Sequence, residues 1–149
     1  MMRLINTAMV YMALGLFSGV FYREYTKLTD TIGVDSQITT LHTHLLSLGM
    51  MMFLLVAALD GVLHLSGRRT FEIFYWVYNA GLILTVVMMV VRGLLTLNGQ
   101  DHASTSAAIP GIAGLGHIII TAGLVFLFVA LREGVKERQQ KAPASIDAA

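Results

Sequence analysis

Cysteine is absent from the 149-residue sequence, and charged residues are scarce. Without cysteine the chain has no disulfides, no thiolate metal ligands, no cysteine-ligated iron–sulfur cluster and no covalently attached c-type heme. Charged residues make up 13%, against about a quarter in soluble domains. A net charge of +1, with no basic run interleaved with aromatics, argues against a nucleic-acid partner. With 56% hydrophobic residues and a mean hydropathy of +0.71, the composition is that of a membrane protein.

Four apolar stretches are long enough to cross a membrane, which takes about 20 helical residues. They cover residues 4–22, 38–65, 71–97 and 109–131. The sequence therefore predicts an all-α fold, an integral membrane four-helix bundle that forms one domain over residues 1–132. For residues 133–149 we predict a charged cytoplasmic tail that is disordered beyond Gln140. Only Arg3 precedes the first stretch and no small-residue cleavage site follows it, so we expect this helix to be retained.

Lysine and arginine are distributed unevenly between the two predicted sides of the membrane. An excess of these residues marks the cytoplasmic side of a multi-pass protein. One side carries only Arg23 and Lys27, whereas the other carries seven such residues. We therefore expect both termini in the cytoplasm (N-in/C-in), and the bacterial inner membrane as the location. The seven residues are Arg3, Arg68, Arg69, Arg132, Lys136, Arg138 and Lys141.

Two histidines, His42 and His44, open the second stretch near its outer end. Because residues i and i+2 of a helix are separated by about 200° around its axis, the two imidazoles point to nearly opposite faces. Histidine is costly inside a bilayer and tends to mark a site, although a hydrogen bond to a neighbouring helix is the alternative. Heme iron is the foremost ligand for opposed imidazoles at one depth, so we predict that both histidines ligate heme iron.

His117 and Arg92 fall in the same outer half of the membrane. From the helical rise, His117 lies about 12 Å below the outer start of the fourth stretch, and Arg92 about 8 Å below the outer end of the third. Arg92 is predicted to pair with a heme propionate, with snorkelling to the outer headgroups as the alternative. His117 is either a further iron ligand or a hydrogen-bonding neighbour of another helix.

The other histidines and the methionines favour plainer interpretations. His64, close to Arg68, is predicted to lie at the membrane interface. His102 is predicted to be solvated in a polar loop, with an outer metal contact as the alternative. Met50–Met52 offers thioethers that heme or copper accepts as ligands, but apolar filling of the helix surface is the favoured interpretation. Copper is therefore not required by any residue pattern.

Asp60 is the one carboxyl deep within the second stretch, and it needs a partner. Asn79, or Tyr11 and Tyr75, are the expected partners. Two roles remain open for it: a proton relay from the cytoplasm, or a hydrogen-bonded residue that helps the helices pack, which we slightly favour.

The start of the second stretch resembles a known family. Leu-His-Thr-His-Leu over residues 41–45, followed by Leu48 and Gly49, is similar to the His-x-His helix of subunit I of heme–copper oxidases and nitric oxide reductases. In that family three four-helix arcs surround the hemes, and the second helix of each arc carries histidine ligands. The chain also looks similar to small four-helix proteins of unknown function that share this motif. It lacks the adjacent histidine pair and the cross-linked tyrosine of the copper centre, so reduction of oxygen or nitric oxide is not implied.

Residues and resemblance together predict a protein that binds heme b without covalent attachment. Its role would be electron transfer with an unidentified redox partner, or binding of a diatomic gas, and a heme-dependent oxidoreductase activity stays open. Opposed histidines predict a homo-oligomer, with a trimer favoured over a dimer and the Gly15–Gly19 face of the first helix as a contact surface. The alternatives are a small channel or transporter lined by Asp60, Arg92 and the histidines, or an accessory subunit of a respiratory complex without heme.

Overall fold

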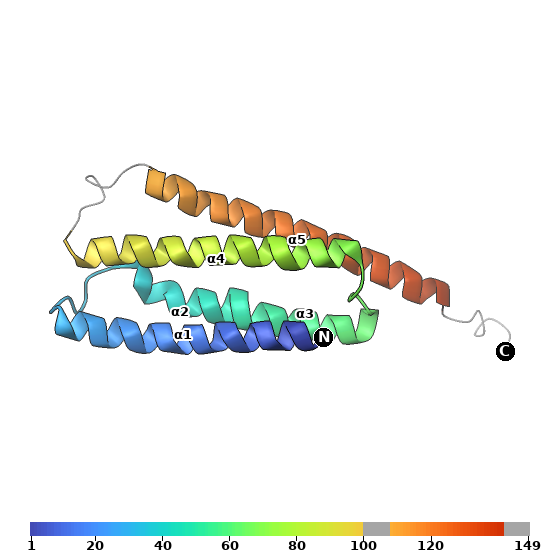
Figure 1. Cartoon of the computed structure of the whole chain (residues 1–149), viewed down its shortest axis with the longest axis horizontal. Coiled ribbons are helices and arrows are strands. Elements are labelled where there is room, and N and C mark those ends of the chain that lie inside the picture. Colours follow the sequence, from blue (N-terminus) through green and yellow to red (C-terminus); the bar gives the residue numbers. More distant parts are fainter. Residues whose placement is uncertain (100–107, 142–149) are drawn as a thin grey trace.

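A computed structural model describes residues 1–99 and 108–141, and this part of the chain is entirely helical, turn or loop. Four long helical segments lie side by side (Figure 1). The second segment is continuous but changes its winding three times along its length. The elements are α1 (Met2–Leu28), η1 (Gln37–Thr40), α2 (Leu41–His44), η2 (Leu45–Met51), α3 (Met52–Leu63), α4 (Arg69–Leu97) and α5 (Ala108–Lys141).

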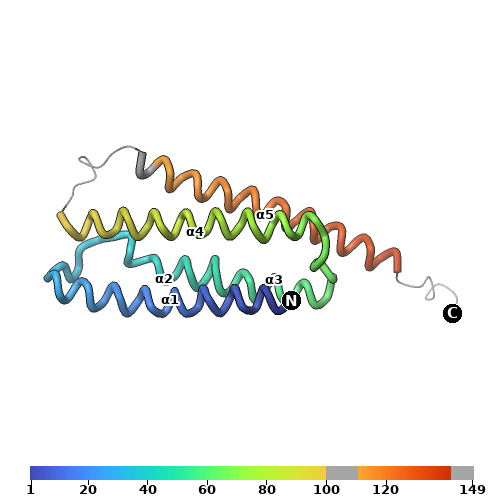
Figure 2. Tube along the Cα trace, viewed as in Figure 1, coloured from blue at the N-terminus to red at the C-terminus, as the bar shows by residue number. Residues whose placement is uncertain are grey.

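The four segments have the length and apolarity of membrane-spanning helices, which confirms the predicted fold class. They cover Met2–Leu28, Gln37–Leu63, Arg69–Leu97 and Gly111–Lys141. Large apolar side chains such as Phe17 and Ile118 point outward and are 67% exposed, as expected for a surface that meets lipid tails. The beginning of α1 and the end of α5 lie at the same end of the molecule (Figure 2). The N-in/C-in orientation itself stays a prediction from charge.

Two helices are longer than the apolar stretches that predict them. α1 continues to Leu28 instead of ending at residue 22, and α5 continues to Lys141 instead of residue 131. In both extensions charged side chains pair within the helix: Lys27 Nζ lies 3.4 Å from Glu24 Oε1, and Lys141 Nζ lies 2.5 Å from Glu137 Oε1. Hydropathy marks only the apolar part of each helix, whereas the helix continues through the charged residues that follow. His102 and residues 142–149 lie outside the described residues.

The core joins α1, α3 and α4 through aromatic rings and polar bridges. Phe53 of α3 is fully buried, with its ring centroid 5.8 Å from that of Tyr11 and 5.7 Å from that of Tyr78. Tyr11 Oη donates to Asn79 Oδ1 at 2.8 Å, which ties α1 to α4. α5 runs along the far side of α4 (Figure 1). α4 therefore contacts α1 and α3 on one side and α5 on the other.

Asp60 has a partner, but not one of those expected. Its carboxylate accepts hydrogen bonds from the backbone N–H and the Oγ of Ser66, both at 2.6 Å, and lies 3.3 Å from the Met1 ammonium. The expectation of Asn79, Tyr11 or Tyr75 was wrong, because Tyr11 bonds to Asn79 and Tyr75 bonds to Thr7. Asp60 therefore holds the turn between α3 and α4 in place.

Gly15 of the Gly15–Gly19 face is buried inside the chain, whereas Gly19 is half-buried, and the use of this face between copies stays a prediction. A Cβ on Gly15 would lie 2.8 Å from Leu46 Cδ2, and one on Gly19 would lie 4.0 Å from His42 Cβ. α1 thus packs closely against α2 and η2 of the same chain, with Tyr11 lying on Gly49 in return. Small residues bring helices together here as expected, but the partner helix is internal.

Candidate functional site

A cavity of about 390 Å³ opens at the end of the bundle where the second segment starts, between that segment, α4 and α5. His44 lines it from α2, Met89 and Arg92 from α4, and His117 from α5. The carboxyl residue Asp35, in the loop before η1, completes one wall. Three of the four residues that the sequence singled out therefore line one cavity, although they are far apart along the chain.

The position of His44 depends on how η1 docks against α4. Ser36 is in extended conformation at the N-cap of η1, and its Oγ donates to the Gly93 carbonyl at 3.0 Å. Gly93 is buried, and a Cβ there would lie 2.9 Å from the backbone N of Ile38. The absent side chain lets η1 lie directly on α4. Because α2 follows η1 without a break, this contact also sets the place of His44.

Both cavity histidines are held in one tautomer by their own helices. His44 Nδ1 lies 3.0 Å from the Thr40 carbonyl oxygen, and His117 Nδ1 lies 3.1 Å from the Ala113 carbonyl oxygen. A carbonyl oxygen only accepts hydrogen bonds, so each Nδ1 is the donor. In the neutral imidazole Nε2 then carries the lone pair, which is the arrangement of a histidine prepared to bind a metal.

His42 lies on another side of its helix. It is exposed and sits beside Gly19 of α1, while His44 faces α4 and α5. The two rings thus point to different faces, as the helical geometry requires. A single copy of the chain brings His44 together with His117 and Arg92, and it leaves His42 outside the cavity.

A π-helical segment, η2, follows the histidine pair directly. Such wide turns are rare and occur most often at functional sites. Tyr78 of α4 donates its hydroxyl to the Leu48 carbonyl of η2 at 2.9 Å, and Gly49 of η2 lies under the Tyr11 ring. α1 and α4 therefore hold this segment from two sides, just below the histidines.

Sequence reasoning missed several residues that build the site. Ser36 and Gly93 dock η1, Thr40 orients His44, and Met89 lines the cavity. The position of Ser36 could have been predicted from the sequence, because serine before an apolar run is typical of a helix N-cap. The contact of Gly93 with Ile38 could not have been predicted, since a single sequence does not show which residues approach one another.

The described residues include no group of three or more histidine, cysteine or acidic side chains arranged to hold a metal ion. Met50–Met52 does not line the cavity, and Met51 is 59% exposed. His64 lies at the opposite end of the bundle and ends α3 in left-handed conformation, with φ of 51°. The cavity therefore offers two imidazoles, one thioether and the Asp35 carboxylate as possible ligands, with the Arg92 guanidinium beside them.

Comparison with known proteins shows the family of this chain. A family model described as "Protein of unknown function (DUF2871)" matches residues 1–134, so the chain belongs to that family. The match covers all four helical segments up to the charged extension of α5. No curated protein and no solved structure matches the chain.

Proposed function

We propose that this protein binds heme b non-covalently in the bacterial inner membrane, with both termini in the cytoplasm. One observation carries the proposal: His44 and His117, from different helices, line one cavity together with Arg92, and both rings are held through Nδ1. The relationship that we propose is with one four-helix arc of heme–copper oxidase subunit I.

The residues around the cavity fit a heme. Heme iron takes imidazole nitrogen, and His44 and His117 each leave Nε2 as the acceptor. Heme also carries carboxylate side chains, and the guanidinium of Arg92 matches a carboxylate in charge and geometry. The cavity volume of about 390 Å³ lies near the lower end of the range of roughly 300–1,000 Å³ for small-molecule sites, so part of the macrocycle would extend beyond it. His44 and His117 would thus hold the iron and Arg92 a propionate.

When bound, heme supplies one-electron redox chemistry and an iron that can take a diatomic gas. The chain's own part is to hold two rings in the ligating tautomer and to place a cation beside them. Ligation by both His44 and His117 favours electron transfer to a redox partner, and an oxidoreductase activity would follow from that. Ligation by one of them favours gas binding.

His42 extends the proposal to more than one copy of the chain. It is exposed beside Gly19 of α1, where a single copy of the membrane-spanning chain would leave the ring against lipid. A second copy that supplied iron or a hydrogen-bond partner would recover the free energy of burying that polar ring. We therefore propose a homo-oligomer in which His42 faces a neighbouring copy, with three copies favoured over two. Because Gly15 is covered within the chain and Gly19 only partly, the contact would use Gly19 or other residues.

The direct test is the absorbance spectrum and native mass of the full chain, purified in mild detergent from a bacterial host. We expect a Soret band, at least one heme per chain, and a multimer of the chain. Colourless protein that takes up no added hemin would overturn the heme proposal and favour the channel or transporter. A heme-loaded monomer would overturn only the oligomer.

Arg92→Leu is expected to weaken heme retention and to lower the midpoint potential. Removing a positive charge near the iron favours the oxidised form, by an amount on the order of tens of millivolts for a partly screened charge. Arg92→Lys keeps the charge but loses the planar fork, so it should retain most of the potential and less of the affinity. Redox titration of the three proteins checks this. An unchanged potential and affinity in Arg92→Leu would mean that Arg92 only snorkels.

A further inference from the structure

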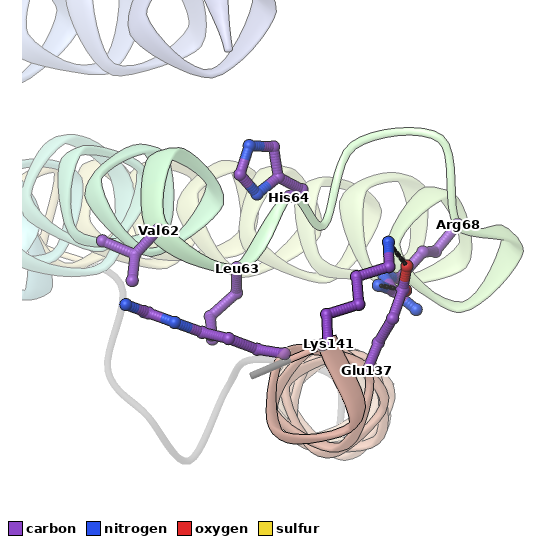
Figure 3. Close-up of a pocket in the computed structure, with 8 residues that line it drawn as sticks. Val62, Leu63, His64, Arg68, Glu137 and Lys141 are labelled. Atoms are coloured by element: carbon purple, nitrogen blue, oxygen red, sulfur yellow. Dashed lines mark hydrogen bonds and ion pairs between the residues drawn. The ribbon is translucent and has the colours of Figure 1, made fainter. Parts of the chain in front are cut away.

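A second cavity, of about 630 Å³, lies at the other end of the bundle, between the end of α3 and the charged extension of α5. Figure 3 shows its side chains, with Glu137 and Lys141 on α5 facing Arg68 in the turn before α4. His64 and Arg138 also line it. This cavity shares no residue with the cavity lined by His44 and His117, so the two are separate sites.

The approach of α5 to the end of α3 forms this cavity. Gly134 is buried there, and a Cβ on it would lie 3.2 Å from the carbonyl oxygen of Leu63 and 3.0 Å from Leu65 Cδ2. α3 ends at this point because His64 takes a left-handed conformation, which turns the chain toward α4. Val62 and Leu63 give the cavity an apolar wall, and Arg68, Arg138 and Lys141 make up its basic wall.

The basic wall has more positive charge than the protein neutralises. Arg68 and Lys141 share the carboxylate of Glu137, each with an N–O distance of 2.5 Å. Arg138 makes no ion pair within residues 1–99 and 108–141. Arg68 Nε is buried and donates to no oxygen of the described residues. Three cations against one carboxylate leave an excess of two positive charges, with one buried donor still without an acceptor.

The cavity also lies at one end of the apolar helical segments, where a membrane would place its lipid headgroups. The last apolar turn of α3 borders it, and the side of the membrane at this end carries seven of the lysine and arginine residues assigned to the two faces. Basic pockets between transmembrane helices on the cytoplasmic side bind the headgroups of anionic phospholipids. We propose that this cavity binds the phosphate of an anionic phospholipid between Arg138 and Arg68, with an acyl chain along Val62.

A membrane lipid matches this cavity better than a soluble phosphate does. A free anion would be served by the basic wall alone, whereas the apolar wall of Val62 and Leu63 adds nothing to its binding. A phosphodiester with acyl chains uses both walls. Its single negative charge neutralises one of the two excess positive charges without displacing Glu137.

The test is native mass spectrometry of the delipidated full chain, titrated with phosphatidylglycerol or phosphatidylcholine. We expect retention of phosphatidylglycerol in preference to phosphatidylcholine, and about fivefold weaker binding of phosphatidylglycerol by Arg138→Gln, since one basic residue near a headgroup contributes about that factor. Arg132→Gln is the matched control, because Arg132 is an exposed cation of the same helix that does not line the cavity.

Three results would overturn the proposal. Equal retention of the two lipids would remove the requirement for an anionic headgroup. Equal losses in Arg138→Gln and Arg132→Gln would show attraction to the whole basic surface and not to the cavity. Displacement of phosphatidylglycerol by millimolar inorganic phosphate at constant ionic strength would assign the cavity to a soluble anion. Heme content does not enter any of these measurements.

Discussion

His44→Ala and His117→Ala should each lose most of the heme that the parent protein carries. The two rings line the same cavity and are both held with Nε2 as the acceptor, so each alanine removes one prepared ligand. Loss of a residue that only orients a ligand costs about 10- to 100-fold in metal affinity, and loss of the ligand itself should cost at least as much. Hemin titration followed by the Soret band measures the effect.

The control for this pair is Ile118→Ala, which changes the residue next to His117 on a surface that is 67% exposed. It should bind heme like the parent. His42→Ala tests the contact between copies separately from the cavity. It should lower the heme content of the multimer, because His42 is proposed to face a neighbouring copy, and it should leave heme binding by His44 and His117 intact. Parental spectra and affinities in both His44→Ala and His117→Ala would contradict the assignment of the cavity.

Gly93→Ala is expected to destabilise the protein by about 1–3 kcal/mol, the usual cost of forcing a side chain into a filled space. The new Cβ would lie 2.9 Å from the backbone N of Ile38 and 3.0 Å from Ser36 Oγ, so η1 must move away from α4. Since α2 follows η1 directly, His44 should move with it. The unfolding temperature in detergent should therefore fall by several degrees, and the affinity for heme should fall as well.

Gly114→Ala makes the same chemical change on α5, where a Cβ would meet nothing within 4 Å. There alanine should be neutral or stabilising, by up to about 1 kcal/mol, because it favours the helix over the unfolded chain. The comparison separates contact at Gly93 from the general effect of replacing glycine. Equal unfolding temperatures in the two variants would show that η1 does not depend on the close approach at Gly93.

Several features of the site were readable from residues alone because they depend on local geometry. The opposed directions of His42 and His44 follow from helical pitch, and the outer depth of His117 and Arg92 follows from the rise per residue. The partner of Asp60 was not readable in this way. Asn79 and Ser66 are both polar and both reachable in principle, and only the turn after α3 brings Ser66 to the carboxylate.

The sequence by itself determined the class of this protein: four long apolar segments and few charges indicate membrane-spanning helices, because lipid leaves backbone groups no other partner than their own helix. Only the tertiary structure decided which residues meet. It placed His44 with His117 and not with His42, covered Gly15 within the chain, and joined Arg68 to Glu137 at the other end. Hydropathy records whether a residue prefers lipid, whereas contacts between helices depend on their rotation and close approach, which glycines such as Gly93 allow at particular points.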